Sequence, residues 1–150
     1  MAELLKQTES VLKDVIESLI DSQEGFREIG EKLHDETLKR YFLAESLKRA
    51  SFKGDLEDVL IKEGVGDAYK ETGSVAGAIH RTWGDLKAKL GGGDHSLLET
   101  AEAGEDKAKK VYADALKHDL PLPVHQLLST QAAHVQASHD YVKAARDSRK

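Results

Sequence analysis

Apolar side chains recur along the chain at spacings of three and four residues, which is the period of an amphipathic α-helix. The first stripe predicts a helix over roughly 3–33, and the second predicts a helix over roughly 35–63 with Asp35 as its N-cap. Only a short connection joins these two stretches, so we expect the two helices to be antiparallel neighbours.

The second half of the chain predicts two more long helices, over roughly 96–117 and roughly 122–147. Ser96 and Glu99 have the spacing of a capping box, and the prolines of "HDLPLPV" suit the first turn of the last helix. Between the two halves, a shorter stripe predicts a helix over roughly 74–90. This helix would carry the chain back along the bundle, because the long helix before it spans roughly 40 Å.

Together these elements predict an all-α fold in which residues 1–150 form one domain. The arrangement we expect is an antiparallel four-helix bundle with a short extra crossover helix, in which one long connection joins two helical hairpins. A plain five-helix up-and-down bundle uses the same elements and is the alternative.

Composition narrows the class of protein. The net charge is −5 with both signs interspersed, so the sequence lacks the basic stripe that nucleic-acid backbones require. The absence of cysteine excludes disulfides, thiolate metal sites and cysteine nucleophiles. No apolar run approaches the roughly 20 residues that span a bilayer, and the N-terminus lacks the pattern of a signal peptide. We therefore expect a cytoplasmic protein that binds neither nucleic acid nor membranes.

Each long helix carries polar residues on or beside its apolar stripe. Glu24 and Glu45 lie at a matching depth, roughly 15 Å from the first turn, and Glu105 and His134 match each other about the second turn. Gln131 shares a helix face with His134, because the two residues are three apart. This alignment predicts one polar layer that crosses the bundle.

The layer has two interpretations, because a buried carboxylate is costly unless it is paired or binds a metal ion. The first is a site for iron, manganese or zinc, since oxygen and nitrogen ligands suit all three. Its candidate ligands are Glu24, Glu45, Glu105 and His134, with Glu102 and Gln131 as supplementary ligands. The second is an internal network in which cations neutralise Glu45 and Glu105. The other members of this network are Lys48, Arg49, Gln131 and His134. The network is favoured, because Lys48 and Gln131 stand where a di-iron carboxylate bundle has histidine and glutamate.

Three stretches carry a resemblance to a known family: "DSQEGFREIGEKL", "GSVAGAIHRTWGDLK" and "EAGEDKAKKVYADAL". The second is the most diagnostic, particularly Gly77, His80, Arg81, Trp83 and Asp85. Over nearly its whole length the chain resembles an uncharacterised bacterial family of ferritin-like four-helix-bundle proteins, classed as a domain of unknown function. The resemblance implies a distant relationship to ferritins and rubrerythrins, and it implies no established substrate or reaction.

The segment "GAIHRTWGD" has two interpretations of its own. His80 and Trp83 lie three apart on one helix face, and Arg81 is placed to pair with Asp85 four residues later. These residues could form a recognition patch or supply a metal ligand. We favour a packing or interface role, in which Trp83 docks the crossover helix against the bundle.

No nucleophile elbow, P-loop or dinucleotide-binding motif is present in the sequence, and we identify no small-molecule substrate. The favoured function is a non-enzymatic structural or stress-associated protein that acts through self-association, with a homodimer favoured. The alternative is a metal-binding protein with a degenerate carboxylate and histidine site in the bundle core.

Overall fold

The computed structural model describes residues 2–62 and 93–149. Its helices are α1 (Ala2–Lys32), α2 (Glu36–Lys62), α5 (Asp94–Leu116) and α6 (Leu122–Asp147). The predicted all-α four-helix bundle is confirmed over this part of the chain. The predicted helix over 74–90 lies outside the described residues, and so does the motif that contains His80, Arg81, Trp83 and Asp85.

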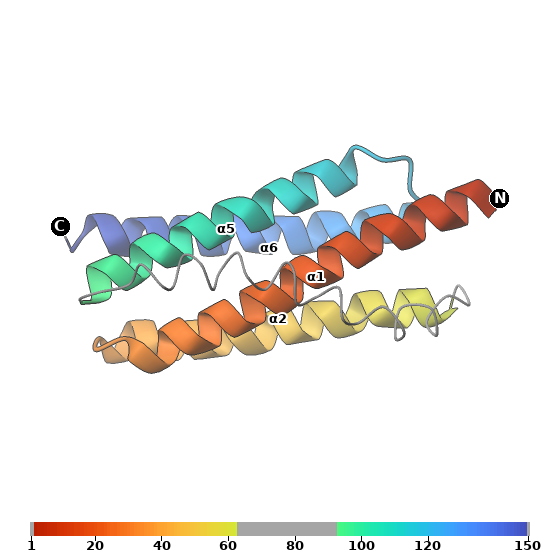
Figure 1. Cartoon of the computed structure of the whole chain (residues 1–150). Coiled ribbons are helices and arrows are strands. Elements are labelled where there is room, and N and C mark those ends of the chain that lie inside the picture. The colour runs from red at the N-terminus through yellow and green to blue at the C-terminus, as the bar shows by residue number, and fades with distance from the viewer. Residues whose placement is uncertain (1, 63–92, 150) are drawn as a thin grey trace.

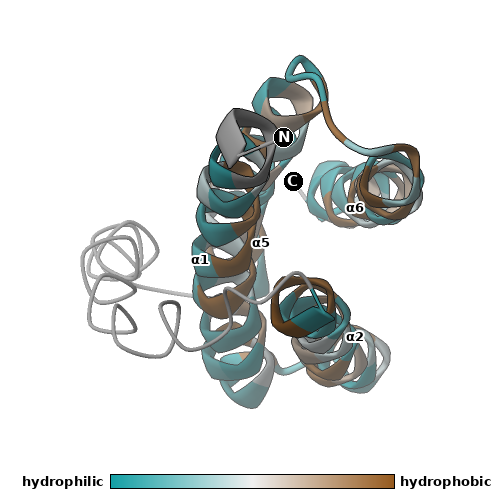
Figure 2. Ribbon diagram, turned by 90° about the vertical axis from the view of Figure 1, so that its right-hand side faces the viewer, coloured by the Kyte–Doolittle hydropathy of each residue, from teal (hydrophilic) through white to brown (hydrophobic). Residues whose placement is uncertain are grey.

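The bundle consists of two antiparallel hairpins, α1 with α2 and α5 with α6, and Figure 1 shows that α2 and α5 run in the same direction. Viewed along the bundle in Figure 2, each helix carries both hydrophobic and hydrophilic stretches, as amphipathic helices do. None of the helices in the described ranges is long and apolar enough to cross a membrane.

The start of α2 follows the sequence prediction. The backbone N–H of Leu38 donates to Asp35 Oδ1 at 2.9 Å, so Asp35 satisfies one of the free N–H groups at the helix start. At the start of α6, Pro121 is the N-cap residue and Pro123 lies in the first turn, where the missing N–H costs no helical hydrogen bond.

The capping box expected at Ser96 is wrong. Helix α5 begins at Asp94, and its N-cap residue Gly93 makes no side-chain capping bond. The carboxylate of Asp94 has a different role, because it accepts the backbone N–H groups of His34 at 2.8 Å and Asp35 at 2.9 Å. This contact fixes the turn between α1 and α2 to the first residue of α5.

The buried apolar side chains form two clusters. The first contains residues of all four described helices, among them Leu12, Leu56, Tyr112 and Leu128. The second lies towards the turn between α1 and α2 and includes Phe26, Phe42, Leu98 and Val142. Buried polar side chains fall between these clusters in the sequence of every helix: Asp21, Ser22, Glu45, Ser46, Arg49, Glu105 and Ser138. Gln131 is also buried, but it lies within the stretch of α6 that belongs to the first cluster. The core therefore has two apolar halves with a polar layer between them.

A glycine on α1 determines how closely α1 and α2 approach each other. A Cβ atom at Gly30 would lie 3.0 Å from Leu43 Cδ2 and 3.1 Å from Phe42 Cβ. These distances are shorter than ordinary van der Waals contacts. The absence of a side chain at Gly30 therefore lets α2 pack closely against α1 beside the second apolar cluster.

Candidate functional site

An ion-pair network lies in the polar layer. The Arg49 side chain of α2 is fully buried, and its Nε donates to Glu45 Oε1 at 2.9 Å. Its Nη2 donates to Glu105 Oε2 of α5 at 2.8 Å, and Glu105 is also fully buried. Because one cation lies between two carboxylates, each buried charge has a partner of opposite sign. Arg49 therefore joins α2 to α5 through the core.

The same arginine also contacts α1. Its Cζ lies 4.9 Å from the centroid of the Phe26 ring, which is a cation–π contact. Burial alone lowers the pKa of Arg49, but the charges of Glu105 and Glu45 and the hydrogen bonds to them outweigh burial and raise that pKa above its ordinary value. Arg49 is therefore a permanent positive charge at the centre of the bundle.

His134 of α6 extends the network from Glu45 towards solvent. Its Nε2 lies 2.8 Å from Oε1 and 3.0 Å from Oε2 of Glu45. The His134 side chain is 33% exposed, whereas that of Glu45 is 5% exposed. The Phe52 ring packs edge-on against the imidazole, with 5.2 Å between the ring centroids. This contact ties α6 to α2 and gives Glu45 a second polar partner.

Gln131 occupies the apolar seam of α6 and is bonded at both ends of its amide. The Tyr112 hydroxyl donates to Gln131 Oε1 at 2.8 Å, and Gln131 Nε2 donates to the backbone oxygen of Phe52 at 3.3 Å. Burial raises the pKa of Tyr112 far above the neutral range, so its hydroxyl remains a hydrogen-bond donor. Gln131 thus links α5, α6 and α2 without adding a charge.

Three of the four candidate core metal ligands lie in this network. Glu45 contacts His134 directly, and Arg49 lies between Glu45 and Glu105. The fourth, Glu24, lies outside it: its Oε2 accepts a bond from Arg27 of the same helix at 2.7 Å, and its side chain is 35% exposed. The four residues therefore do not surround one common point.

Lys48 does not belong to the network, contrary to the prediction. Its side chain is exposed, and its Nζ lies 5.5 Å from the centroid of the Phe52 ring. Arg49, four residues after Glu45, shares the inward face of α2 with that glutamate. Lys48 is turned by one residue from that face, and its long stem lets the ammonium group reach water. The sequence analysis named both Lys48 and Arg49 as cations of the network. In the structure Arg49 takes this role and Lys48 does not.

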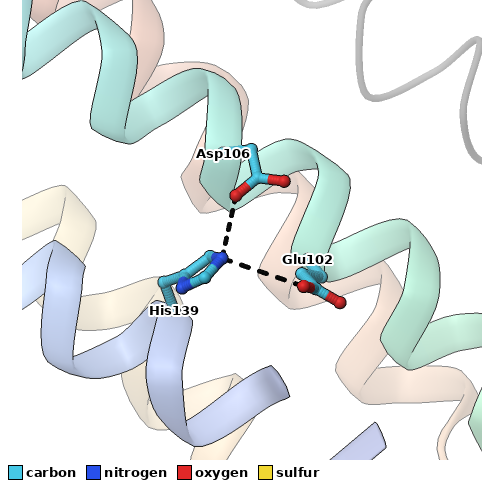
Figure 3. Close-up of side chains that lie close together, drawn as sticks. All are labelled: Glu102, Asp106 and His139. Carbon is cyan, nitrogen blue, oxygen red and sulfur yellow. Dashed lines mark ion pairs between the residues drawn. The ribbon is translucent and has the colours of Figure 1, made fainter.

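Glu102 also lies outside the core layer, in a second polar group between α5 and α6. Its Oε2 accepts a bond from Arg146 Nη1, and its Oε1 lies 3.9 Å from His139 Nε2. The same imidazole nitrogen lies 2.8 Å from Asp106 Oδ1 (Figure 3). Glu102, Asp106 and His139 thus form a carboxylate–histidine cluster whose ligand atoms all lie within 4.8 Å of one another.

The sequence analysis missed Asp106 and His139 as members of one group. Glu102 and Asp106 are four residues apart on α5, and this spacing places both carboxylates on one helix face. That spacing was the available signal. His139 is five residues after His134 and so faces a different side of α6, which the structure shows to be the side next to Asp106.

Comparison with known proteins gives one family. A family model with the description "Domain of unknown function (DUF2383)" matches residues 7–118. The matched region includes α2, α5 and most of α1, and with them Arg49, Glu45 and Glu105. No curated protein matches the chain.

Proposed function

The chain belongs to the DUF2383 family, and on this premise we propose that it is a non-enzymatic structural protein that acts by pairing with a second copy of itself. The observation that carries the proposal is Arg49, which lies fully buried between Glu45 and Glu105. Carboxylates that could have held a metal ion are instead paired with the protein's own cation. The core layer then has a structural role, because it holds the helices together. The residues that carry the function lie on the surface.

The same observation argues against the alternative of a metal ion in the core. A metal bound by Glu45 and Glu105 would have to displace the guanidinium that hydrogen-bonds to both. The displaced guanidinium would then be buried without a counter-charge, which is strongly unfavourable. We propose a ferritin-like relationship as well, in which Arg49 pairs with carboxylates that would serve as metal ligands in such bundles.

The outer face of α2 is the surface that we propose for pairing. Leu47 is 73% exposed and Ile61 is 56% exposed, and these are the two most exposed large apolar side chains of α2. They are nearly four helical turns apart, so they lie on one side of the helix. Single exposed apolar residues are ordinary, but two on one face give a second copy something to cover.

Charge along this face favours a second copy of the same chain. Arg40 lies in the first half of α2, and Asp55 and Asp58 lie in the second half; all three side chains are exposed. A two-fold axis near the middle of α2 would place two α2 helices antiparallel, with Arg40 of each copy opposite Asp58 of the other. An isologous interface must be self-complementary in this way. Leu47 of the two copies would then meet near the axis.

Analytical ultracentrifugation of the whole chain tests the pairing. We expect a concentration-dependent dimer that is weakened by Leu47→Gln and by Arg40→Asp, and restored when Arg40→Asp is combined with Asp58→Arg. Leu122→Gln is the matched control, because Leu122 is 68% exposed but belongs to α6. A chain that stays monomeric at high concentration, or one whose dimer ignores Leu47 and Arg40, would contradict the proposal.

A further inference from the structure

We propose that the carboxylate–histidine cluster of Glu102, Asp106 and His139 binds a divalent transition-metal ion, with zinc as the best fit. The cluster lies between α5 and α6, as Figure 3 shows, and none of the three residues takes part in the Arg49 network or in the outer face of α2. The inference therefore stands apart from the proposed pairing of two copies.

The orientation of His139 is the first argument. Its Nδ1 lies 3.2 Å from Asp140 Oδ1, within hydrogen-bonding distance of that carboxylate. Asp140 is itself held by Gln136, whose Nε2 donates to the same oxygen at 2.9 Å. A carboxylate beside one ring nitrogen is how proteins commonly orient a histidine whose other nitrogen binds a metal.

The environment of Nε2 is the second argument. Nε2 lies 2.8 Å from Asp106 Oδ1 and 3.9 Å from Glu102 Oε1. When Nδ1 carries the ring proton, the lone pair of Nε2 faces both carboxylate oxygens. A lone pair that faces two carboxylate oxygens is repelled unless a positive charge lies between them. A divalent cation bound to all three atoms supplies this charge.

The burial of the three side chains suits a metal ion. The His139 side chain is 9% exposed and that of Glu102 is 13% exposed, so both are held in place by their surroundings. Asp106 is 61% exposed and leaves the metal open to water on one side. One nitrogen and two carboxylate oxygens, with solvent in the remaining position, is a ligand set that zinc accepts.

Arg146 orients the remaining ligand without blocking it. Its Nη1 bonds to Glu102 Oε2, which leaves Oε1 turned towards His139. The arginine also offsets part of the negative charge of Glu102, Asp106 and Asp140. We therefore expect binding by a single ion per cluster and no tight accumulation of further cations there.

Isothermal titration of the full chain, purified without a histidine tag, with zinc chloride tests this site. We expect one saturable ion per chain, and a loss of affinity of roughly tenfold or more in Asp140→Asn, whose residue only orients the ligand. His139→Gln and Asp106→Asn should lose the saturable site altogether. His134→Gln is the matched control, because His134 faces Glu45 in the core layer.

A second readout keeps the result independent of heats of binding. Cobalt substitution should give visible absorption bands in the wild-type chain and in His134→Gln, but not in His139→Gln, and circular dichroism shows whether each variant is folded. Equal zinc affinity in the wild type and His139→Gln, or the absence of any saturable binding, would overturn the proposal and leave His139 as a polar partner of Asp106 alone.

Discussion

At the scale of single residues, the buried layer depends on hydrogen bonds that have specific partners. Arg49 and Gln131 both lie in the interior but have different roles. Arg49 pairs with two buried carboxylates, and Gln131 fills an apolar seam with an amide whose two ends are bonded. A buried polar group that loses its partner keeps the cost of leaving water. Substitutions in this layer should therefore destabilise the fold even when they change little volume.

Tyr112→Phe tests this argument at Gln131. The change removes the hydroxyl that donates to Gln131 Oε1 and keeps the ring, so we expect a loss of about 1–3 kcal/mol in the free energy of unfolding. Tyr141→Phe is the matched control: its ring stacks on Tyr41 with 3.8 Å between centroids, and its side chain is 37% exposed. The control should change stability by less than about 0.5 kcal/mol. Urea unfolding at equilibrium measures both, and equal effects would contradict the role given to the hydroxyl.

At the scale of helices, the two hairpins are held together by Asp94 at one end of the bundle. Its carboxylate accepts backbone N–H groups from the turn between α1 and α2, at 2.8 and 2.9 Å. Arg149, just after α6, reaches the same turn and donates to Asp35 Oδ2 at 2.7 Å. The ends of α5 and α6 thus meet the turn of the first hairpin through charged groups.

The contact made by Asp94 gives a pH dependence of known sign. Partial burial raises the pKa of Asp94, but the hydrogen bonds from the backbone N–H groups of His34 and Asp35 lower that pKa by more. The pKa of Asp94 therefore lies below its ordinary value of 3.8. A carboxyl group with a lowered pKa in the folded state stabilises the protein above pH 3.8 and loses this contribution as the pH falls through the folded value.

We therefore expect Asp94→Asn to be less stable than the wild type at neutral pH, with a difference that shrinks as the solution is acidified below about pH 4. Thermal unfolding of both chains between neutral and acidic pH measures this difference. Asp119→Asn, at an exposed position, serves as the control for the loss of one negative charge. A difference that stays constant with pH would show that Asp94 acts by packing alone.

At the scale of the whole molecule, the fold was easier to predict than the sites, for a physical reason. The helices depend on a local period of apolar residues, and the stripes along α1, α2, α5 and α6 predicted them. The start of α5 was misplaced because the partners of Asp94 lie in the turn between α1 and α2, far away in the sequence. No local pattern around Ser96 contains that contact.

The polar layer was predictable in outline only. Matching depths along each hairpin pointed to Glu45, Glu105 and His134, but they did not show that Arg49 turns inward while Lys48 turns to solvent. The cluster at His139 was missed because it requires the register of α5 against α6. A shift of one turn would separate His139 from Asp106, and the sequence of the connecting loop does not fix that register.

The central claim is that Arg49 is the cation of the core, and the free energy of unfolding tests it most directly. Arg49→Met leaves Glu45 and Glu105 buried without a counter-charge, so we expect a loss of about 3–5 kcal/mol. The triple variant Glu45→Gln, Arg49→Met, Glu105→Gln removes all three charges and should recover most of that loss. Lys48→Met is the matched control and should behave like the wild type. A wild-type stability for Arg49→Met, or a triple variant as unstable as the single one, would contradict the account.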